Sequence, residues 1–342
     1  MRIFATTDHH DHHCIELDEG QLIPSWEGPD RADIVDAELG RRRFDDVSRP
    51  GEFDRSLAER VHAADYLDFL ETAYERWIAA ELKGECAMSN GWPARRMRHV
   101  RPEGIVAQLG YYSFAADCSI GARTWPAVVD AARTADAAAQ YVAGGASSAF
   151  ARCRPPGHHA SRDQFGGYCY LNNAAIAAER LRVSGVEHVA VLDVDYHHGN
   201  GTQDIFYHRG DVSFCSLHAD PRVEFPYFLG HSDEEGIAAG TEANLNLPLP
   251  RGTESDAWFA ALETAIRWID LRGADALVVS LGVDTFVDDP ISQFRLASDD
   301  FSRLGSRLAE MKRPTVFVME GGYATEALGK NMVNVLEGFA LK

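Results

Sequence analysis

Short runs of apolar residues, separated by longer amphipathic stretches, form the hydrophobic pattern of this chain. Two of the runs, VAVLDVD and DALVVSLG, are apolar at nearly every position. That pattern is typical of strands buried on both faces of a parallel sheet. Runs of this kind predict six strands, at residues 1–6, 149–153, 188–194, 211–217, 275–281 and 314–319.

Helical periodicity fills the intervals between these strands. Leu67, Leu70, Tyr74, Trp77 and Ile78 recur at the spacing that places residues on one face of a helix. Further helices are predicted at residues 125–143, 171–184, 254–272, 299–311 and 325–340. Because strands and helices alternate, we expect an α/β fold with a mostly parallel sheet and helices on both of its faces.

One segment, residues 83–104, interrupts this alternation. It combines chain-breaking and basic residues, namely Gly84, Gly91, Pro93, Arg95, Arg96, Arg98, Arg101 and Pro102. It is either a solvated surface loop or the rim of an interface or active site, since long loops in compact domains are often functional. We therefore predict a single domain over residues 1–342 with an inserted loop at about 83–104.

Composition excludes several classes of protein. Apolar residues make up 45% of the 342 residues, as in an ordinary globular protein. The chain has 33 basic and 52 acidic residues, a net charge of −19, which argues against nucleic-acid and anionic-membrane partners. The same charge is compatible with a cationic ligand.

Cysteine usage and the absence of long apolar stretches indicate a cytoplasmic protein. The six cysteines are scattered singly without a CxxC pair, so neither a disulfide scaffold nor a cysteine zinc cage is expected. We expect no transmembrane helix and no signal peptide. GxxxxGK[ST], GxSxG and HExxH motifs are absent, which disfavours nucleoside-triphosphate and serine-esterase chemistry.

Reactive residues follow four of the predicted strands. The motifs RPPGHH, DVDYHHGN, GVD and EGGY come at or after the ends of strands 149–153, 188–194, 275–281 and 314–319. In open α/β sheets, ligands bind outside the carboxyl ends of the strands. The four motifs therefore predict one site at one edge of the sheet.

A metal site is predicted from three of these residues. Asp195 and His197 are two residues apart at a strand end, so their side chains point the same way. Asp284, at another strand end, can supply a third ligand. Two carboxylates and an imidazole suit Zn²⁺ or Fe²⁺, and three protein ligands leave room for water and substrate.

A tandem of histidines, His158 and His159, follows two prolines that hold the approach extended. Next to a metal, such a pair can supply a general base and an electrostatic partner. Asp193 and Asn200 flank the metal segment, and each could hold the Nδ1 of one imidazole. The alternative is a pair of core histidines.

Aromatic residues near glycines are further candidates. Tyr323 follows two glycines and could donate a hydrogen bond to a developing oxyanion. Gly167, Tyr168 and Phe225 could face the ligand, although packing explains them equally well. The N-terminal run Asp8–His13 looks like a metal motif, but no strand end aims it, and we expect a surface rim.

A family resemblance is carried by five motifs in order: RPPGHHA, GGYCYLNNAA, VLDVDYHHGNGTQDIF, SLGVDTF and MEGGY. With them essentially the whole chain resembles the arginase/deacetylase superfamily, and within it the histone-deacetylase-related enzymes, most narrowly the bacterial acetylpolyamine amidohydrolases. The resemblance implies a single α/β domain with an eight-stranded parallel sheet. It also implies zinc-dependent hydrolysis of the acetyl amide of small N-acetylated amines.

The resemblance implies two metal ions. Zinc, with iron as a possible metal in vivo, would be held by Asp195, His197 and Asp284. A structural potassium ion beside it would be held by Asp193, Asp195, His197, Ser216 and Leu217.

Catalytic roles also follow from the resemblance. His159 would be the general base and His158 its electrostatic partner, with Asp193 and Asn200 behind them and Tyr323 binding the oxyanion. Gly167, Tyr168 and Phe225 would line the substrate tunnel. The insertion would pair two subunits in a homodimer and narrow that tunnel.

Two departures weaken the case for long polyamines. Enzymes of the polyamine type carry acidic residues at the tunnel mouth, where this chain has Val106 and the shorter Asp117. The alternatives are a broader amidohydrolase of N-acyl or aryl amides, an acetyl-lysine deacetylase, or a silent sensor of acetylated ligands. A binuclear manganese ureohydrolase is disfavoured, because Gly282 stands where such enzymes need an aspartate.

Overall fold

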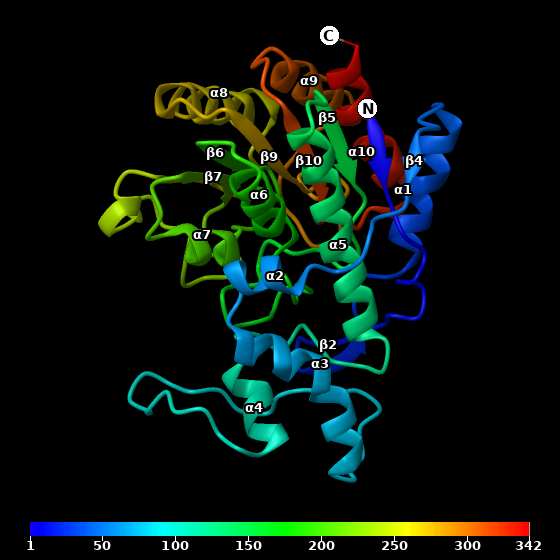
Figure 1. Cartoon of the computed structure of the whole chain (residues 1–342), viewed down its shortest axis with the longest axis vertical. Coiled ribbons are helices and arrows are strands. Elements are labelled where there is room, and N and C mark those ends of the chain that lie inside the picture. Colours follow the sequence, from blue (N-terminus) through cyan, green and yellow to red (C-terminus); the bar gives the residue numbers. More distant parts are fainter. Residues whose placement is uncertain (342) are drawn as a thin grey trace.

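An eight-stranded parallel sheet forms the centre of the computed structural model, which describes residues 1–341 (Figure 1). The strands follow the order β4-β1-β5-β10-β9-β6-β7-β8, and all neighbours pair in parallel. Their bounds are Val47–Ser48, Arg2–Phe4, Ser148–Ala151, Thr315–Met319, Ala276–Leu281, Val189–Asp193, Val212–Ala219 and Asn244–Leu249 in that order. The predicted fold class is confirmed.

The two edge strands, β4 and β8, were not predicted. β4 has only two residues, too few for a hydrophobic pattern. β8 reads NLNLPL, in which asparagines alternate with leucines and Pro248 follows. An edge strand tolerates this composition because one side of its ladder needs no partner. A separate antiparallel hairpin, β2 (Ile15–Asp18) and β3 (Gln21–Pro24), was also missed.

Helices cover both faces of the sheet, as predicted. Val189 and Val191 of β6 pack into one hydrophobic cluster, and Ala190 and Leu192 pack into the other. The first cluster is closed by α2 (Arg55–Val61), α3 (Ala64–Ala79), α4 (Ile105–Tyr111), α5 (Thr124–Ala143), α6 (Asn173–Val183) and α7 (Asn200–Phe206). The second is closed by α1 (Asp30–Arg41), α8 (Ser255–Arg272), α9 (Ser298–Ala309) and α10 (Thr325–Ala340).

The helix predictions succeeded where the chain is long and periodic. All six predicted helices are present, with ends within a few residues of the expected ones. The four that were missed are α1, α2, α4 and α7. Three of these have only seven residues, and α1 is rich in charge.

The order of the central strands brings the four predicted motifs together. β5, β10, β9 and β6 are consecutive neighbours in the sheet, although they are far apart in the sequence. Because the strands are parallel, their carboxyl ends share one edge. The loops that follow them therefore converge on a single site.

The insertion, residues 83–104, has no helix, and its only strand-like contact among the described residues is a bridge between Ala87 and Ile120. It packs against α4. Trp92 donates its indole N–H to Ser113 at 2.9 Å, and a Cβ on Gly110 would lie 1.7 Å from the Gly91 carbonyl oxygen. Figure 1 shows α3, α4 and this loop projecting at the end opposite the chain termini.

Within residues 1–341, no helix is both long enough and apolar enough to cross a bilayer. The six cysteines of this region are free.

Candidate active site

Two carboxylates and one imidazole meet at the ends of β6 and β9. His197 Nδ1 lies 3.2 Å from Asp284 Oδ2 and 3.4 Å from Asp195 Oδ1. Backbone N–H groups fix both carboxylates: Asp284 accepts from Tyr196 at 2.9 Å, and Asp195 accepts from Gly321 at 2.9 Å. One ligand atom of each residue lies within 4.8 Å of those of the others.

The charge balance of this trio suits a divalent cation. Both carboxylates are buried, with side chains at most 1% exposed. Burial, together with repulsion from Asp195, raises the pKa of Asp284 to about 8. Burial opposes a charge on His197 as well, yet hydrogen bonds to the two carboxylates raise its pKa to about 10. A field this negative, in a set of one nitrogen and two oxygen donors, fits Zn²⁺ or Fe²⁺.

Glycines close the space beside the trio. A Cβ on Gly282 would lie 2.1 Å from Asp195 Oδ2, and one on Gly321 would lie 2.6 Å from carboxylate oxygens of both Asp195 and Asp284. An aspartate at position 282 therefore has no room. This geometry gives a physical reason for the mononuclear site that the sequence predicts.

The tandem histidines stand beside the trio with the predicted partners behind them. His158 Nδ1 lies 3.0 Å from Asp193 Oδ2, and His159 Nδ1 lies 2.6 Å from Asn200 Oδ1. The two rings are 4.0 Å apart between centroids. Since an amide oxygen only accepts, Nδ1 of His159 donates to Asn200 and Nε2 is left as the base.

These partners give the two histidines opposite proton affinities. Burial alone would lower the pKa of His158, but the Asp195 and Asp193 carboxylates raise it to about 10. Burial and repulsion from His158 and His197 lower the pKa of His159 well below its usual range. These directions keep the His159 ring neutral, so that Nε2 carries a lone pair and no proton, and they favour the charged form of His158.

Tyr323 lies next to the trio and the histidine pair, and we call these residues together the floor of the site. Its backbone N–H donates to Asp289 Oδ2 at 2.7 Å, and the Arg31 guanidinium lies 4.7 Å from the centre of its ring. Arg31 also donates to the carbonyl oxygens of Gly322 and Glu320, at 2.8 and 2.6 Å. Burial raises the pKa of the phenol well above its usual value, so Tyr323 keeps its proton for donation.

Aromatic side chains line a cavity of about 280 Å³ next to this floor. Phe225 meets the ring of His159 edge to face at 5.0 Å, and Tyr168 meets Tyr323 in the same way at 5.8 Å. Gly167 has a φ of +59°, and a Cβ there would lie 2.2 Å from Cδ2 of His159. The three predicted tunnel residues thus lie against the predicted catalytic residues.

Four of the residues that line the cavity are acidic, and we refer to these four as the rim. They are Glu16, Asp18, Asp117 and Glu224, and within residues 1–341 no lysine or arginine lines the cavity. Glu224 is paired with Arg251, which leaves three carboxylates without a basic partner in the cavity lining. Glu16 accepts a hydrogen bond from the Tyr168 hydroxyl, and Asp117 accepts one from the Gly167 N–H at 2.8 Å.

Val106 lies elsewhere in the single chain. It is partly buried on α4 and packs against the hydrophobic cluster that contains α3 and α5. In a single chain it does not line the cavity, and its predicted place at the tunnel mouth of a dimer stays a prediction.

The predicted potassium ligands lie on two adjacent strands. Asp193 ends β6 and is the register partner of Ser216 on β7, with Leu217 next along that strand. Asp193 Oδ1 accepts the Asp195 N–H at 3.1 Å, and Ser216 Oγ lies 2.8 Å from His218 Nδ1. These residues lie close together, and their role as potassium ligands stays a prediction.

The N-terminal run corrects one expectation. We expected the run Asp8–His13 to lie at the surface. This expectation is wrong for His9 and His12, which are each only 1% exposed, although the residues between them are exposed. Nδ1 of His12 lies 3.3 Å from Thr124 Oγ1, and its ring meets Tyr170 edge to face. Two histidines of the run therefore point inward.

Several site residues were missed in the sequence. Arg31 and Asp289 position Tyr323, and Glu320 accepts the N–H groups of Gly157 and His158 at 2.6 and 3.1 Å. Glu320 directly precedes Gly321, so the strand-end rule that located Tyr323 also points to it. Arg31 and Glu16 had no such signal, because their segments carry no recognised motif.

The fold and the strand-end site together define an α/β enzyme of the arginase/deacetylase class. A family model described as "Histone deacetylase domain" matches residues 26–339. The chain belongs to the histone deacetylase domain family. Both the predicted resemblance and the prediction of a deacetylase-type enzyme are confirmed.

Individual relatives cover nearly the whole chain. Acetylpolyamine amidohydrolase 1 of Pseudomonas aeruginosa is 52% identical, over 95% of this chain and 94% of its own length. Acetylpolyamine amidohydrolase of Mycoplana ramosa is 47% identical, over 99% and 100%. The crystal structure of acetylpolyamine aminohydrolase from Burkholderia pseudomallei superposes with a TM-score of 0.94 at 40% identity and covers 99% of this chain and 98% of its own.

Proposed function

We propose that this protein hydrolyses the acetyl amide of small N-acetylated amines, acetylpolyamines and acetyldiamines, to acetate and a free amine, in a zinc-dependent reaction. One observation carries the proposal: the Asp195–His197–Asp284 trio meets, through His197, a cavity that His159 and Tyr323 also line. The names of the relatives support the same substrate class.

The trio is the proposed metal site. A zinc ion held there would supply Lewis acidity toward the amide carbonyl and toward the attacking water. Iron, which accepts the same donors, is the alternative in vivo. Potassium, held by Asp193, Asp195, His197, Ser216 and Leu217, would offset part of the negative charge at the end of β6.

The chain's own residues then move the protons. Nε2 of His159 takes a proton from water, because Nδ1 is committed to Asn200. Tyr323 donates its O–H to the oxygen on which negative charge develops. His158, charged by Asp193 behind it, stabilises that negative charge, and a histidine of the pair delivers a proton to the departing amine nitrogen.

The rim supports a cationic substrate. Glu16, Asp18 and Asp117 line the cavity, whose volume of about 280 Å³ admits a slender chain. A cationic amine one diamine length from the scissile amide would lie among these carboxylates. A neutral amide would carry no positive charge to pair with these carboxylates.

The test is acetate release from acetylputrescine by protein stripped of metal and then reloaded. Activity that vanishes on stripping and returns with Zn²⁺ supports the proposal. Turnover that survives complete metal removal overturns the zinc requirement. Absence of acetate release from every acetylated amine, with zinc bound, overturns the reaction itself and favours a silent sensor.

A second candidate, a broader amidohydrolase or an acetyl-lysine deacetylase, is favoured by one observation. The resemblance implies acidic residues at the tunnel mouth where this chain has Val106 and the shorter Asp117, and in the single chain only Asp117 lines the cavity. An aryl acetamide and an acetyl-lysine peptide, assayed beside acetylputrescine, distinguish the candidates. Equal or faster turnover of either would favour the second candidate.

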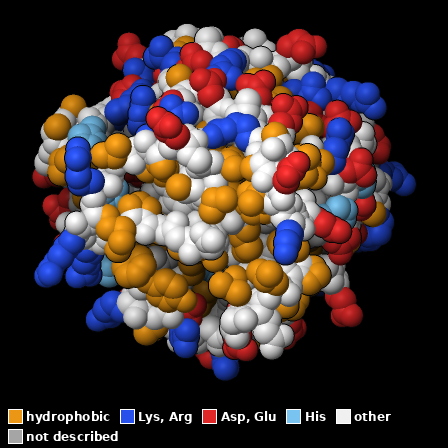
Figure 2. Space-filling model, turned by 90° about the horizontal axis from the view of Figure 1, so that it is seen from below, with side chains coloured by type: hydrophobic (Ala, Val, Ile, Leu, Met, Phe, Trp, Pro, Cys, Tyr) orange, Lys and Arg blue, Asp and Glu red, His pale blue; other side chains and the backbone are white. Residues whose placement is uncertain are grey.

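We also propose a cytoplasmic homodimer that forms through the insertion. Figure 2, which looks at the end carrying α3, α4 and the insertion, shows hydrophobic side chains gathered over a broad patch. Trp92, Met97 and Val100 of the insertion are 36%, 63% and 58% exposed. Light scattering tests the proposal: a dimeric wild type and a monomeric Met97→Asp/Val100→Asp variant support it, and a monomeric wild type contradicts it.

A further inference from the structure

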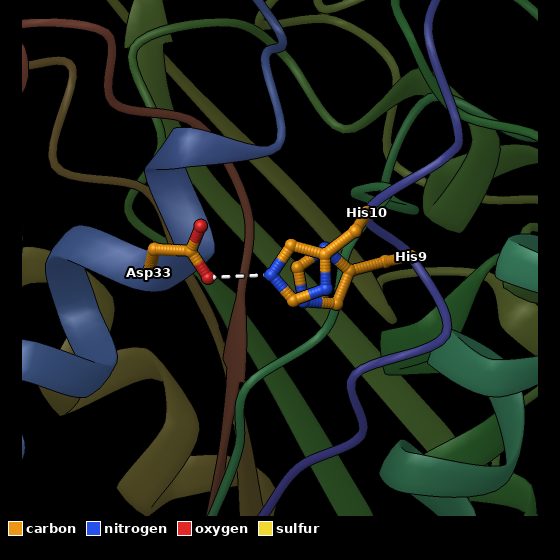
Figure 3. A group of neighbouring side chains, drawn as sticks. All are labelled: His9, His10 and Asp33. Carbon is orange, nitrogen blue, oxygen red and sulfur yellow. Dashed lines mark hydrogen bonds and ion pairs between the residues drawn. The ribbon is translucent and has the colours of Figure 1, made fainter.

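A second cluster of metal-binding side chains lies outside the active site. His9 and His10, from the N-terminal segment, meet Asp33 from α1, and one ligand atom of each lies within 4.8 Å of those of the others. Figure 3 shows the two imidazole rings stacked opposite the Asp33 carboxylate. The ring centroids are 4.3 Å apart and the planes are inclined by 24°. The cluster shares no residue with the trio at the strand ends.

His10 is oriented in the manner of a metal ligand. Its Nδ1 lies 2.6 Å from the carbonyl oxygen of Thr7, so this nitrogen must carry a proton and donate it. Its Nε2 lies 2.8 Å from Asp33 Oδ1. A lone pair on Nε2 would face the carboxylate oxygen directly, and that contact requires a second proton or a cation. Histidines that bind metal commonly have one ring nitrogen fixed by a backbone carbonyl, as Nδ1 is here, and present the other to the metal.

The environment of His9 is a second observation, independent of His10, that points to a ligand. It is 1% exposed, and within residues 1–341 neither of its ring nitrogens has a hydrogen-bond partner. A buried, unpaired imidazole is unfavourable unless something else binds it. Burial and the nearby Arg152 and Arg154 lower the pKa of His9 to about 3, so the ring is neutral and its lone pair is available.

The surrounding charges do not exclude a cation. Arg152 is paired with Asp36 at 2.9 Å, and Arg154 is paired with Glu27 at 3.0 Å. Asp33 itself is exposed, which gives a cation access from solvent and leaves space for water as a further ligand. Two imidazoles and one carboxylate form a donor set that transition metals, Zn²⁺ above all, accept.

We propose that His9, His10 and Asp33 form a second divalent-metal site, selective for Zn²⁺ and related transition metals, that clasps the N-terminal segment to α1. The N-terminal segment and α1 each also form hydrogen bonds with residues next to the active site. Arg154, which precedes the tandem histidines, donates to the carbonyl oxygens of His9 and His12 at 2.5 and 2.7 Å. On α1, Arg31 donates to Gly322 next to Tyr323. Metal in the clasp would therefore stabilise the supports of the catalytic loops.

The test counts zinc in the full chain after dialysis against a Zn²⁺ buffer. Wild type is expected to hold two zinc ions per chain, and His10→Ala/Asp33→Asn only one. The His10 and Asp33 side chains are exposed, so folding should survive. The matched control, Asp11→Asn/His13→Ala, changes exposed residues of the same run and should keep both ions. A His197→Ala variant should lose the other ion, which separates this proposal from the zinc-dependent mechanism.

A second readout avoids dependence on stoichiometry alone. Co²⁺ added to the His197→Ala variant should give a visible d–d spectrum and a higher melting temperature, and both should disappear when His10 and Asp33 are also replaced. The proposal is overturned if wild type holds one ion that only His197→Ala removes. It is equally overturned if the His10/Asp33 variant keeps both ions.

Discussion

The floor and the rim of the cavity are built on opposite principles. The floor consists of side chains at parallel strand ends, and each functional atom has a fixed buried partner, as with His159 on Asn200 or His158 on Asp193. The rim lies on a hairpin and loops, and three of its four carboxylates, Glu16, Asp18 and Asp117, have no basic partner in the cavity lining. From this difference we expect the floor to determine the reaction and the rim to determine which amide reacts. Substitutions in the floor should therefore reduce turnover, and those in the rim should change substrate preference.

The largest effect is expected from Asp284→Ala. The variant removes one of the three proposed metal ligands and leaves His197 without its contact to Asp284. Because a catalytic metal supplies several kcal/mol of charge stabilisation, kcat/KM should fall by about 10³-fold or more. Zinc content by atomic emission and acetate release are the measurements. A variant that keeps its zinc and more than a tenth of the activity would remove Asp284 from the metal site.

Next comes Tyr323→Phe, which deletes one hydroxyl and keeps the ring between Arg31 and Tyr168. Loss of one oxyanion donor lowers kcat by about 10²-fold or more. KM and zinc content should stay close to wild type, since the hydroxyl acts in the transition state. Near-normal kcat would show that Tyr323 only packs.

Gly167→Ala tests how tightly the wall fits the floor. The new Cβ would lie 2.2 Å from the His159 ring, and φ there is +59°. Displacing the base by about 1 Å costs about 10²-fold in kcat. The control is Gly273→Ala, which has a φ of +71° and no neighbour within 4 Å. It carries the same backbone strain far from the base and should leave kcat unchanged, whereas equal losses in both would point to strain alone.

A smaller effect, on KM, is expected when the carboxylates of the rim take up protons at low pH. Burial raises the pKa of Glu16 to about 7 and that of Asp117 to about 6. Both are charged above about pH 8 and take up protons as the pH falls through these values. KM for acetylputrescine should therefore rise severalfold on acidification, while KM for a neutral acetamide stays level. Parallel changes for the two substrates would locate the titrating groups in the floor.

The sequence predicted the floor better than the rim for a physical reason. Parallel strands bring their carboxyl ends to one edge, so Asp195, Asp284 and Tyr323 could be assigned to one site from the strand pattern alone. No such rule places a hairpin or an insertion. Glu16 was therefore missed, and Val106 was placed at a mouth that it does not line in the single chain.

The same contrast holds in the fold. Strands with continuous apolar runs and helices with several turns were found, because their pattern repeats often enough to be read. β4, with two residues, and α7, with seven, have no period to detect. The buried orientation of His9 also depends on tertiary packing, which local sequence does not encode.

The most direct measurement is the ratio of kcat/KM for acetylputrescine to that for N-acetylbutylamine, its neutral counterpart, in wild type and in Glu16→Gln/Asp117→Asn. The exposed Asp256→Asn on α8 is the control. Charge pairing at the rim should give wild type and control a preference of about tenfold or more for the cation, and the double variant should lose it with kcat nearly intact. Equal kcat/KM for the two substrates in wild type would contradict the account.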